Sequence, residues 1–217
     1  KKVPQLFNAT GATKWGEPKD FPWTMGWQPS YQSEGKIYAQ HILETKPNAK
    51  IAILYQNDDY GRDYLKGFEE GLGDKGKTMI IKKLTYEATD ATIDSQMVEL
   101  KSSGADTFFN ITIPKFAAQA IKKAADIGWK PTHYLNGVSS SVASVIIPAG
   151  VDNATGVITA YYLKDPTDPK WSKDPAIALY RTIMARYAKG ANAKDVYHVY
   201  GMAVAYATVN LLKRLGK

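Results

Sequence analysis

From Ala49 onward, five short runs rich in β-forming residues alternate with stretches that have the spacing of amphipathic helices. The runs are 50–56 (KIAILYQ), 77–84 (KTMIIKKL), 106–111 (DTFFNI), 132–136 (THYLN) and 156–160 (GVITA). Strands and helices that alternate in this way predict an α/β fold with a doubly wound parallel sheet. In such a sheet, ligands bind in the crevice beyond the carboxyl ends of the strands. The pattern therefore predicts the place of a binding site as well as the fold.

Capping residues mark where several helices should start and stop. Ser30 is suited to the N-cap of one helix, and Asp58 or Asp59 to that of the next. Pro114 suits the first turn of a helix that stops before Gly128, and another helix is expected over 92–103. A run of serines at 139–141 precedes a short helix that ends near Pro148.

The segments that flank this core are expected to belong to something else. Two short strands are predicted at 3–8 and 21–27, and two helices at about 175–189 and 196–215, where Asp174 and Pro175 form a cap and first turn. These segments have too few partners to form a full second domain, so we expect one complete lobe, one partial lobe and a truncated chain. The apolar run 196–212 is too short and too polar to span a bilayer, and it predicts a buried helix.

Composition excludes several classes of function. The net charge of +7 comes almost entirely from Lys, since Arg occurs only at 62, 181, 186 and 214. The lysines are spread along the chain without the Arg and aromatic interleaving of a nucleic-acid surface, so we expect a solvated exterior. The absence of Cys excludes disulfides, zinc thiolates and a cysteine nucleophile.

Residues 71–78 (GLGDKGKT) match the phosphate-binding pattern G-x-x-x-x-G-K-[ST]. That loop works when a strand precedes it and a helix follows, so that the helix N-terminus faces phosphate. Here a helix precedes and a strand follows, and Asp74 puts a negative charge where phosphate would lie. We therefore interpret these residues as the end of a helix and a turn.

No catalytic or metal-binding constellation stands out. His41, His133 and His198 show neither the spacing nor the neighbouring carboxylates of a zinc site. The serines at 139–141 lack the G-x-S-x-G surroundings of a nucleophile elbow, and the paired aspartates are explained as helix caps. We expect a protein that is not an enzyme and that holds no cofactor or metal.

Four polar turns follow predicted strands, at 9–11, 57–61, 110–114 and 136–140. Each offers backbone N–H groups, small hydroxyls or an aromatic ring, and all four should lie along one edge. Neutral donors beside an aromatic wall suit a small organic anion or a polar aromatic ligand.

Several of these segments carry a family resemblance. Val3-Pro4, 54–72 (LYQNDDYGRDYLKGFEEGL), 104–106 (GAD), 124–131 (AADIGWKP) and 200–212 (YGMAVAYATVNLL) resemble the periplasmic solute-binding proteins of branched-chain amino-acid-type ABC transporters. The likeness covers essentially the whole chain, and it is strongest to members that bind aromatic acids. It implies the type I periplasmic binding fold, with two α/β lobes that close on a ligand. It also implies a periplasmic location and a membrane permease as partner.

The resemblance implies a division into lobes and a set of ligand contacts. Residues 1–27 and 164–217 would form part of one lobe and residues 28–163 the other, complete lobe. With one lobe partial, we expect this chain to bind ligand weakly. The residues that match the family's ligand-contacting positions are Ala9, Thr10, Gly11, Tyr60, Thr112, Ile113, Asn136 and Gly137.

The turn at Asn136–Gly137 departs from the amino-acid binders of the family, which place an acidic residue there against the ligand ammonium. No carboxylate stands between Leu135 and Ser144. A buried, unpaired ammonium costs several kcal/mol, against about 8 kcal/mol for the whole affinity of a micromolar binder. We therefore expect a carboxylate ligand without an amine, such as an aromatic acid. An amino-acid-binding protein of the same family, a ligand-sensing ectodomain and an enzyme on this scaffold are the alternatives.

Overall fold

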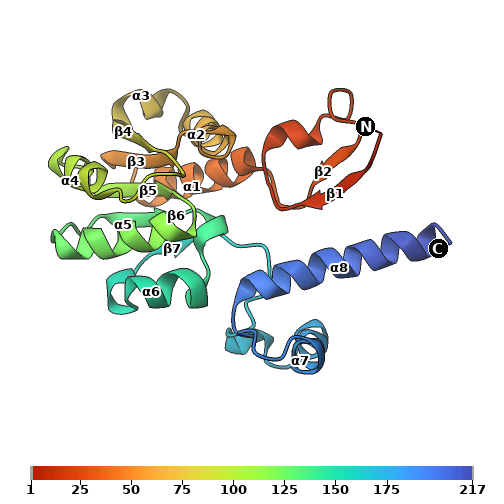
Figure 1. The fold of residues 1–217 in the computed structure, drawn as a ribbon. Coiled ribbons are helices and arrows are strands. Elements are labelled where there is room, and N and C mark those ends of the chain that lie inside the picture. Colours follow the sequence, from red (N-terminus) through yellow and green to blue (C-terminus); the bar gives the residue numbers. More distant parts are fainter. Residues whose placement is uncertain (1, 217) are drawn as a thin grey trace. The chain divides into compact units, whose positions relative to one another are not determined.

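The computed structural model describes residues 2–216 (Figure 1). The chain divides into two compact units, one of residues 1–140 and 145–161 and the other of residues 141–144 and 162–217. The expected lobe boundary at 163 stays a prediction. The first 27 residues group with the central α/β core in this division. Their assignment to a lobe shared with residues 164–217 stays a prediction.

The first unit is built around a five-stranded sheet in which every neighbouring pair is parallel. The strands, in their order across the sheet, are β4 (Ile80–Tyr86), β3 (Ile51–Gln56), β5 (Thr107–Ile111), β6 (Thr132–Leu135) and β7 (Ile158–Thr159). Leu54 pairs with Asn110, and Asn110 pairs with Leu135. The carboxyl ends of β3, β5 and β6 therefore lie side by side. The predicted α/β fold with a parallel, doubly wound sheet is confirmed.

Helices cover both faces of this sheet (Figure 1). On one face, α1 (Tyr31–Thr45) and α2 (Asp59–Leu72) pack on Ile53 and Phe109. On the other face, α4 (Asp94–Ser102) and α5 (Pro114–Asp126) pack on Leu54 and Phe108. Neighbouring strand residues point to opposite faces, because side chains alternate along a strand, and this alternation gives the sheet two apolar cores.

Most predicted helix boundaries are confirmed. The Asp58 carboxylate accepts a hydrogen bond from the Gly61 amide and so caps α2. Pro114 is the first residue of α5, and Gly128 follows that helix with a φ of 67°. Ser30 does precede α1, but its side chain does not cap the helix. Its hydroxyl instead pairs with that of Thr13 at 2.9 Å.

The strand expected at 77–84 begins later, at Ile80, because residues Gly76–Met79 form the short helix α3. The Lys77–Asp74 ion pair and the bond from the Thr78 hydroxyl to the Lys75 carbonyl favour this extra helical turn. The phosphate-loop match thus lies on the end of α2 and the turns after it. No strand precedes it, as expected.

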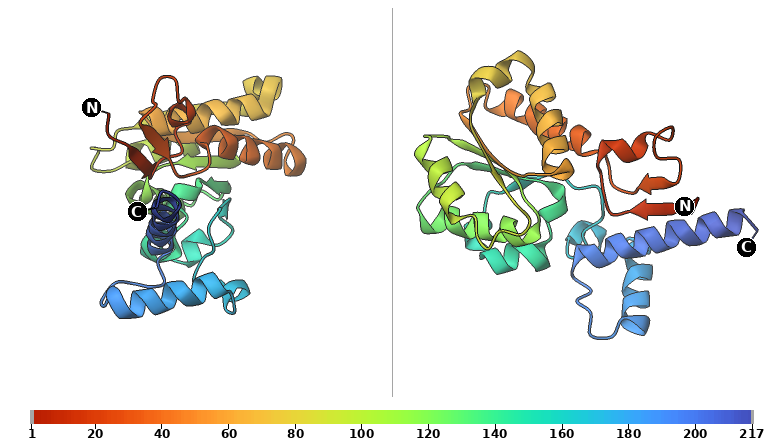
Figure 2. Two further views of the ribbon diagram at one scale, coloured as in Figure 1. Left: turned by 90° about the vertical axis from the view of Figure 1, so that its right-hand side faces the viewer. Right: turned by 45° about the horizontal axis from the view of Figure 1, so that its top comes forward.

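Two further segments of the chain have short elements. Strands β1 (Gln5–Asn8) and β2 (Thr24–Gly26) form a separate parallel pair (Figure 2). After β6, helical turns at Gly137–Ser139 and Val142–Ile146 lead into α6 (Ile147–Ala149). The serine run therefore does open a helical segment, as predicted.

The second unit contains α7 (Pro175–Tyr187) and α8 (Val196–Arg214). Asp174 caps α7, since its carboxylate accepts from the amides of the next helical residues. The expectation of a buried C-terminal helix is wrong. Val196 is the one buried residue of α8, while Tyr206, Val209 and Leu212 are exposed, because no element of the described chain covers them. Within residues 2–216, no helix is both long and apolar enough to cross a membrane.

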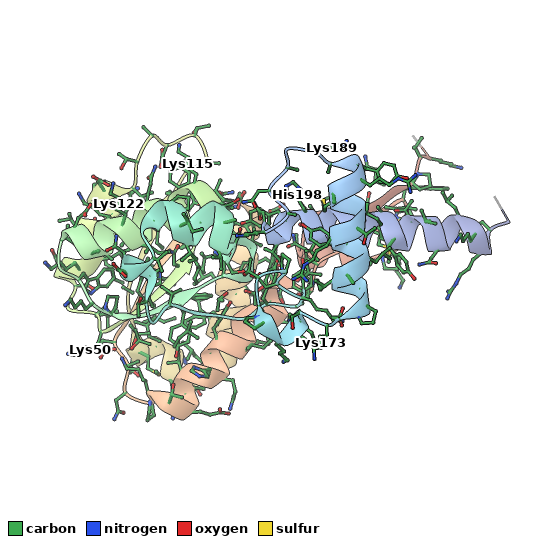
Figure 3. The ribbon with its side chains drawn as sticks, turned by 90° about the horizontal axis from the view of Figure 1, so that it is seen from below. Lys50, Lys115, Lys122, Lys173, Lys189 and His198 are labelled. Carbon is green, nitrogen blue, oxygen red and sulfur yellow. The ribbon has the colours of Figure 1, made fainter. Side chains whose placement is uncertain are left out.

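The lysines lie where a solvated exterior predicts them. Lys50, Lys115 and Lys122 are exposed on the first unit, and Lys173 and Lys189 are exposed on the second (Figure 3). His198 is also exposed on α8. The positive charge is thus spread over both units.

Candidate functional site

Hydrogen bonds connect the turn after β3 to the turn after β5. The Tyr86 hydroxyl, at the end of β4, donates to Gln56 Oε1 at 2.8 Å and accepts from the Ile113 amide at 2.9 Å. Gln56 Nε2 donates in turn to Asp58, the cap of α2. Turns 57–61 and 110–114 are therefore fixed relative to each other through one buried tyrosine.

A second set of hydrogen bonds connects the turn after β5 to the turn after β6. Asn136 Nδ2 donates to the Asn110 carbonyl at 3.1 Å and to the Thr112 carbonyl at 2.9 Å. The Ser139 hydroxyl donates to the same Thr112 carbonyl. The three turns 57–61, 110–114 and 136–140 thus lie along one edge of the sheet, as the sequence predicted. The fourth turn, 9–11, follows β1, which belongs to the separate two-stranded sheet.

Several expected contact residues are occupied by these internal bonds. The Thr112 hydroxyl donates to Asn110 Oδ1 at 2.7 Å, and the side chains of Thr112 and Asn136 are fully buried. Asn136 Oδ1 has no hydrogen-bond partner among the described residues. In this structure Thr112, Ile113 and Asn136 hold the turns together. Their role as ligand contacts stays a prediction.

The loop after β1 is attached to the start of α1. Tyr31 donates its amide to the Gly11 carbonyl at 2.8 Å, and the Ala12 amide donates to the Thr10 hydroxyl at 3.1 Å. Gly11 is buried, whereas Ala9 is exposed. The expected contacts Thr10 and Gly11 therefore lie next to Tyr31, which the sequence analysis did not single out.

Asp63 of α2 fastens the same loop. Its carboxylate accepts from the amide and the hydroxyl of Thr13, both at 2.8 Å, and from Gln32 Nε2 at 2.6 Å. An ion pair joins Lys14 to Asp59. These bonds hold residues 10–14 against the first turns of both helices.

Three tyrosine rings form a cluster beside this loop. Tyr31 stacks on Tyr64 with ring centroids 4.7 Å apart, and Tyr60 meets both rings edge to face at 5.2 and 5.4 Å. Burial raises the pKa of Tyr60, whose hydroxyl has no hydrogen-bond partner among the described residues. Tyr31 contacts the ring of Tyr60 and bonds to the Gly11 carbonyl, so it connects these two expected ligand contacts. A tyrosine at the start of each of two neighbouring helices was the signal that could have revealed Tyr31.

A partly buried carboxylate lies next to the cluster. Glu34 Oε1 accepts from the Tyr38 hydroxyl at 2.8 Å and from the Gly137 amide at 2.6 Å, and Oε2 accepts from the Tyr64 hydroxyl at 2.6 Å. Burial raises the pKa of Glu34, although the three hydrogen bonds oppose this shift. The sequence offered one signal, since Glu34 stands on the same helical stripe as the buried Tyr31 and Tyr38.

Glu34 changes the interpretation of the turn at Gly137. In the sequence, no carboxylate occurs between Leu135 and Ser144. The structure brings one from α1, 103 residues earlier in the chain. The premise that no carboxylate lies near this turn is therefore wrong, and the expectation of a ligand without an amine stays a prediction.

A cavity of about 500 Å³ lies in the first unit, lined by residues between 10 and 30. Trp15, Phe21 and Met25 give it apolar walls, and Thr10 and Gly11 form part of its lining. Its polar lining side chains are those of Thr10, Thr13, Thr24, Gln28 and Ser30. A cavity of this size with both apolar walls and polar groups suits a small organic ligand.

The histidines do not form a reactive or metal-binding group. Burial lowers the pKa of His133 to about 3, so its ring is neutral, and it packs on Phe108. His41 Nδ1 lies 2.9 Å from the Tyr134 hydroxyl. Among residues 2–216, no group of three or more His, Asp or Glu side chains could hold a metal ion.

The family model described as "Periplasmic binding protein" matches residues 1–217. The chain belongs to this family of periplasmic binding proteins. The homologues in this family are solute-binding proteins.

Two curated relatives cover part of this binding protein. Leu/Ile/Val-binding protein homolog 7 of Brucella suis biovar 1 is 28% identical over 97 residues, which are 45% of this chain and 24% of the relative. Leu/Ile/Val-binding protein homolog 8 of Brucella abortus is 25% identical over 114 residues, 52% of this chain and 28% of the relative. The matched regions thus make up about a quarter of each relative.

Solved structures share the fold of this binding protein. A branched-chain amino acid ABC transporter protein from Thermus thermophilus with bound valine aligns with a TM-score of 0.82 at 18% identity, covering 98% of this chain and 54% of that one. A solute-binding protein of an R. palustris ABC transporter in complex with benzoate aligns with a TM-score of 0.68 at 19% identity, covering 88% and 50%. These likenesses confirm the type I periplasmic binding fold.

Proposed function

We propose that this binding protein captures a small carboxylate-bearing solute in the periplasm and presents it to the membrane permease of an ABC importer. The observation that carries the proposal is the convergence of Gly11, Tyr60 and Gly137 on the tyrosine cluster at the carboxyl edge of the sheet. Ligands of doubly wound sheets bind at that edge.

We propose an aromatic carboxylate as the ligand. The loop at Thr10 and Gly11 offers a hydroxyl and backbone groups for a carboxylate, and the ring of Tyr60 offers an edge or face for an aromatic ring. The benzoate complex of the R. palustris protein supports this ligand class, because that protein shares the fold.

An amino acid is the second candidate, and a specific observation favours it. Glu34 places a carboxylate beside Gly137, where the ammonium of a zwitterion would need an opposite charge. The Thermus thermophilus protein with bound valine shares the fold as well. The two candidates differ in whether the ligand carries an amine.

Calorimetry on the full-length protein distinguishes them. We expect benzoate- or cinnamate-type acids to bind with micromolar affinity and leucine to bind at least about tenfold more weakly, a difference of about 1.4 kcal/mol. Tight leucine binding would select the amino-acid candidate, and no binding of either class would contradict the receptor proposal.

A pair of tyrosine variants locates the site. Tyr60→Ala removes a ring of the cluster and should weaken ligand binding about tenfold or more. The control is Tyr187→Ala, since Tyr187 on α7 is 71% exposed. Equal affinities of the two variants would place the ligand elsewhere.

A further inference from the structure

The Glu34 carboxylate connects three elements that are far apart in the sequence. It belongs to α1, and its donors are Tyr64 on α2, the Gly137 amide after β6 and Tyr38 one helical turn along α1. Within residues 2–216, no Lys or Arg side chain forms an ion pair with it. Within the described residues, its hydrogen-bond donors are these three groups, and the residue is partly buried.

The Tyr38 hydroxyl has more acceptors than protons. It lies 2.8 Å from Glu34 Oε1 and 2.9 Å from the Leu135 carbonyl, and it accepts from the Ala160 amide at 2.9 Å. A tyrosine hydroxyl carries one proton, so it can donate to only one of the two acceptors at a time. Glu34 Oε1 and the Leu135 carbonyl oxygen therefore compete for the Tyr38 proton.

The charge on Glu34 decides this competition. An ionised carboxylate only accepts, and it attracts the Tyr38 proton more strongly than the neutral Leu135 carbonyl does. A protonated Glu34 has an O–H group of its own to donate to the Tyr64 oxygen. The Tyr38 proton is then free to turn to Leu135, the last residue of β6.

Gly137 has no room for a side chain at this junction. A Cβ atom at position 137 would stand 2.6 Å from the Ala160 carbonyl and 3.1 Å from Glu34 Oε1. The turn after β6, the chain leaving β7 and the Glu34 carboxylate therefore meet at one point. A change in the hydrogen bonds of any one of these three groups therefore changes the surroundings of the other two.

The titratable groups that face Glu34 come from the two helices. Tyr31 and Tyr38 lie on α1, and Tyr60 and Tyr64 lie on α2. The turn 136–140 and residues 158–160 contain no titratable side chain. Because burial raises the pKa values of all four tyrosines, Glu34 is the member of this group that changes its charge at the lowest pH.

We propose that Glu34 is a positioning residue of the ligand site, whose protonation state sets how the turn at Gly137 and the chain leaving β7 at Ala160 are held. The link to ligand binding rests on the proposed function, in which the Gly137 turn meets the solute. The hydrogen bonds that connect Glu34 to the amide of Gly137, and through Tyr38 to the amide of Ala160, do not depend on the proposed function. Proton binding at Glu34 and the geometry of the turn are thereby coupled.

Nuclear magnetic resonance tests the coupling without any ligand. In the isotopically labelled protein, the Glu34 carboxyl carbon and the amides of Gly137 and Ala160 are followed from about pH 4 to about pH 8, a range that contains ordinary and raised carboxyl pKa values. We expect the three signals to move with one common midpoint, above the ordinary value for a glutamate.

Three variants separate the coupling from a merely structural role. Glu34→Gln should abolish the pH-dependent shift of both amides. Tyr38→Phe should abolish the shift of Ala160 and keep that of Gly137, since only Ala160 depends on the Tyr38 hydroxyl. Glu44→Gln, at an exposed position of the same helix, should leave both shifts unchanged.

Two results would overturn the proposal. One is a Glu34 carbon that does not titrate in this range, and the other is a titrating carbon with a Gly137 amide that stays still. If Glu34→Gln does not fold, the pH titrations of the wild type and of Tyr38→Phe still test the proposal. A protein that binds none of the tested solutes would contradict the receptor proposal and leave these shifts unaffected.

Discussion

The ring of Tyr31 lies so close to Gly11 that a Cβ atom at position 11 would stand 2.7 Å from its Cδ1 atom. The same atom would stand 2.3 Å from the Pro29 carbonyl, which belongs to the backbone and cannot rotate away. A larger residue than glycine therefore does not fit at position 11, in the loop that is expected to bind the ligand.

Gly11→Ala should destabilise the protein by about 1–3 kcal/mol, the usual cost of overpacking. Urea unfolding measures the change. Gly16→Ala is the matched control in the same loop, because nothing lies within 4 Å of a Cβ atom there. A Gly11→Ala variant as stable as Gly16→Ala would mean that the loop does not pack on Tyr31.

Gly67→Ala should separate α1 from α2. A Cβ atom at position 67 would stand 2.2 Å from the Gln32 carbonyl, and this contact is between backbones. We expect a loss at the upper end of about 1–3 kcal/mol. Gly201→Ala on α8 has open space around it and should gain about 1 kcal/mol, the helix-propensity difference between the two residues. Opposite signs in urea unfolding confirm the prediction, and a loss in both variants contradicts it.

Tyr60→Phe and Tyr86→Phe each remove one hydroxyl group, and we expect opposite effects on the stability of the protein. The Tyr60 hydroxyl is buried without a partner among the described residues, so its removal should stabilise the ligand-free protein, by up to about 1 kcal/mol. The Tyr86 hydroxyl bonds to Gln56 and to the Ile113 amide, so its removal should cost about 1–3 kcal/mol. Thermal unfolding of both variants checks this, and equal shifts in Tm would contradict it.

The sequence could predict those parts of the fold that depend on neighbouring residues. The caps at Asp58 and Pro114 and the β-rich run that forms β3 are local, and the structure confirms them. The edge that carries the polar turns follows from parallel topology, because every strand ends on the same side.

The parts that could not be predicted depend on packing between distant segments. Glu34 meets Gly137 only because α1 lies against the turn after β6, and Tyr31 meets Gly11 only because the loop after β1 folds onto α1. The exposure of α8 has a similar origin. An apolar helix is buried only if another element covers it, and helix composition does not say which element that is.

His133 should make the protein less stable as the pH falls. Burial lowers the pKa of its ring from 6.5 to about 3 in the folded state, so the unfolded chain binds a proton first. The stability contributed by the neutral ring is fully present above pH 6.5 and is lost as the pH falls towards 3. Between these values the free energy of unfolding should fall by up to about 1.4 kcal/mol per pH unit from this group.

Urea unfolding at several pH values tests this slope. His133→Phe keeps an aromatic ring against Phe108 and removes the titration, so its stability should depend less on pH than that of the wild type. His198→Gln changes an exposed histidine and should keep the wild-type slope. If His133→Phe loses stability with falling pH as steeply as the wild type, the buried ring is not the group that destabilises the protein in acid.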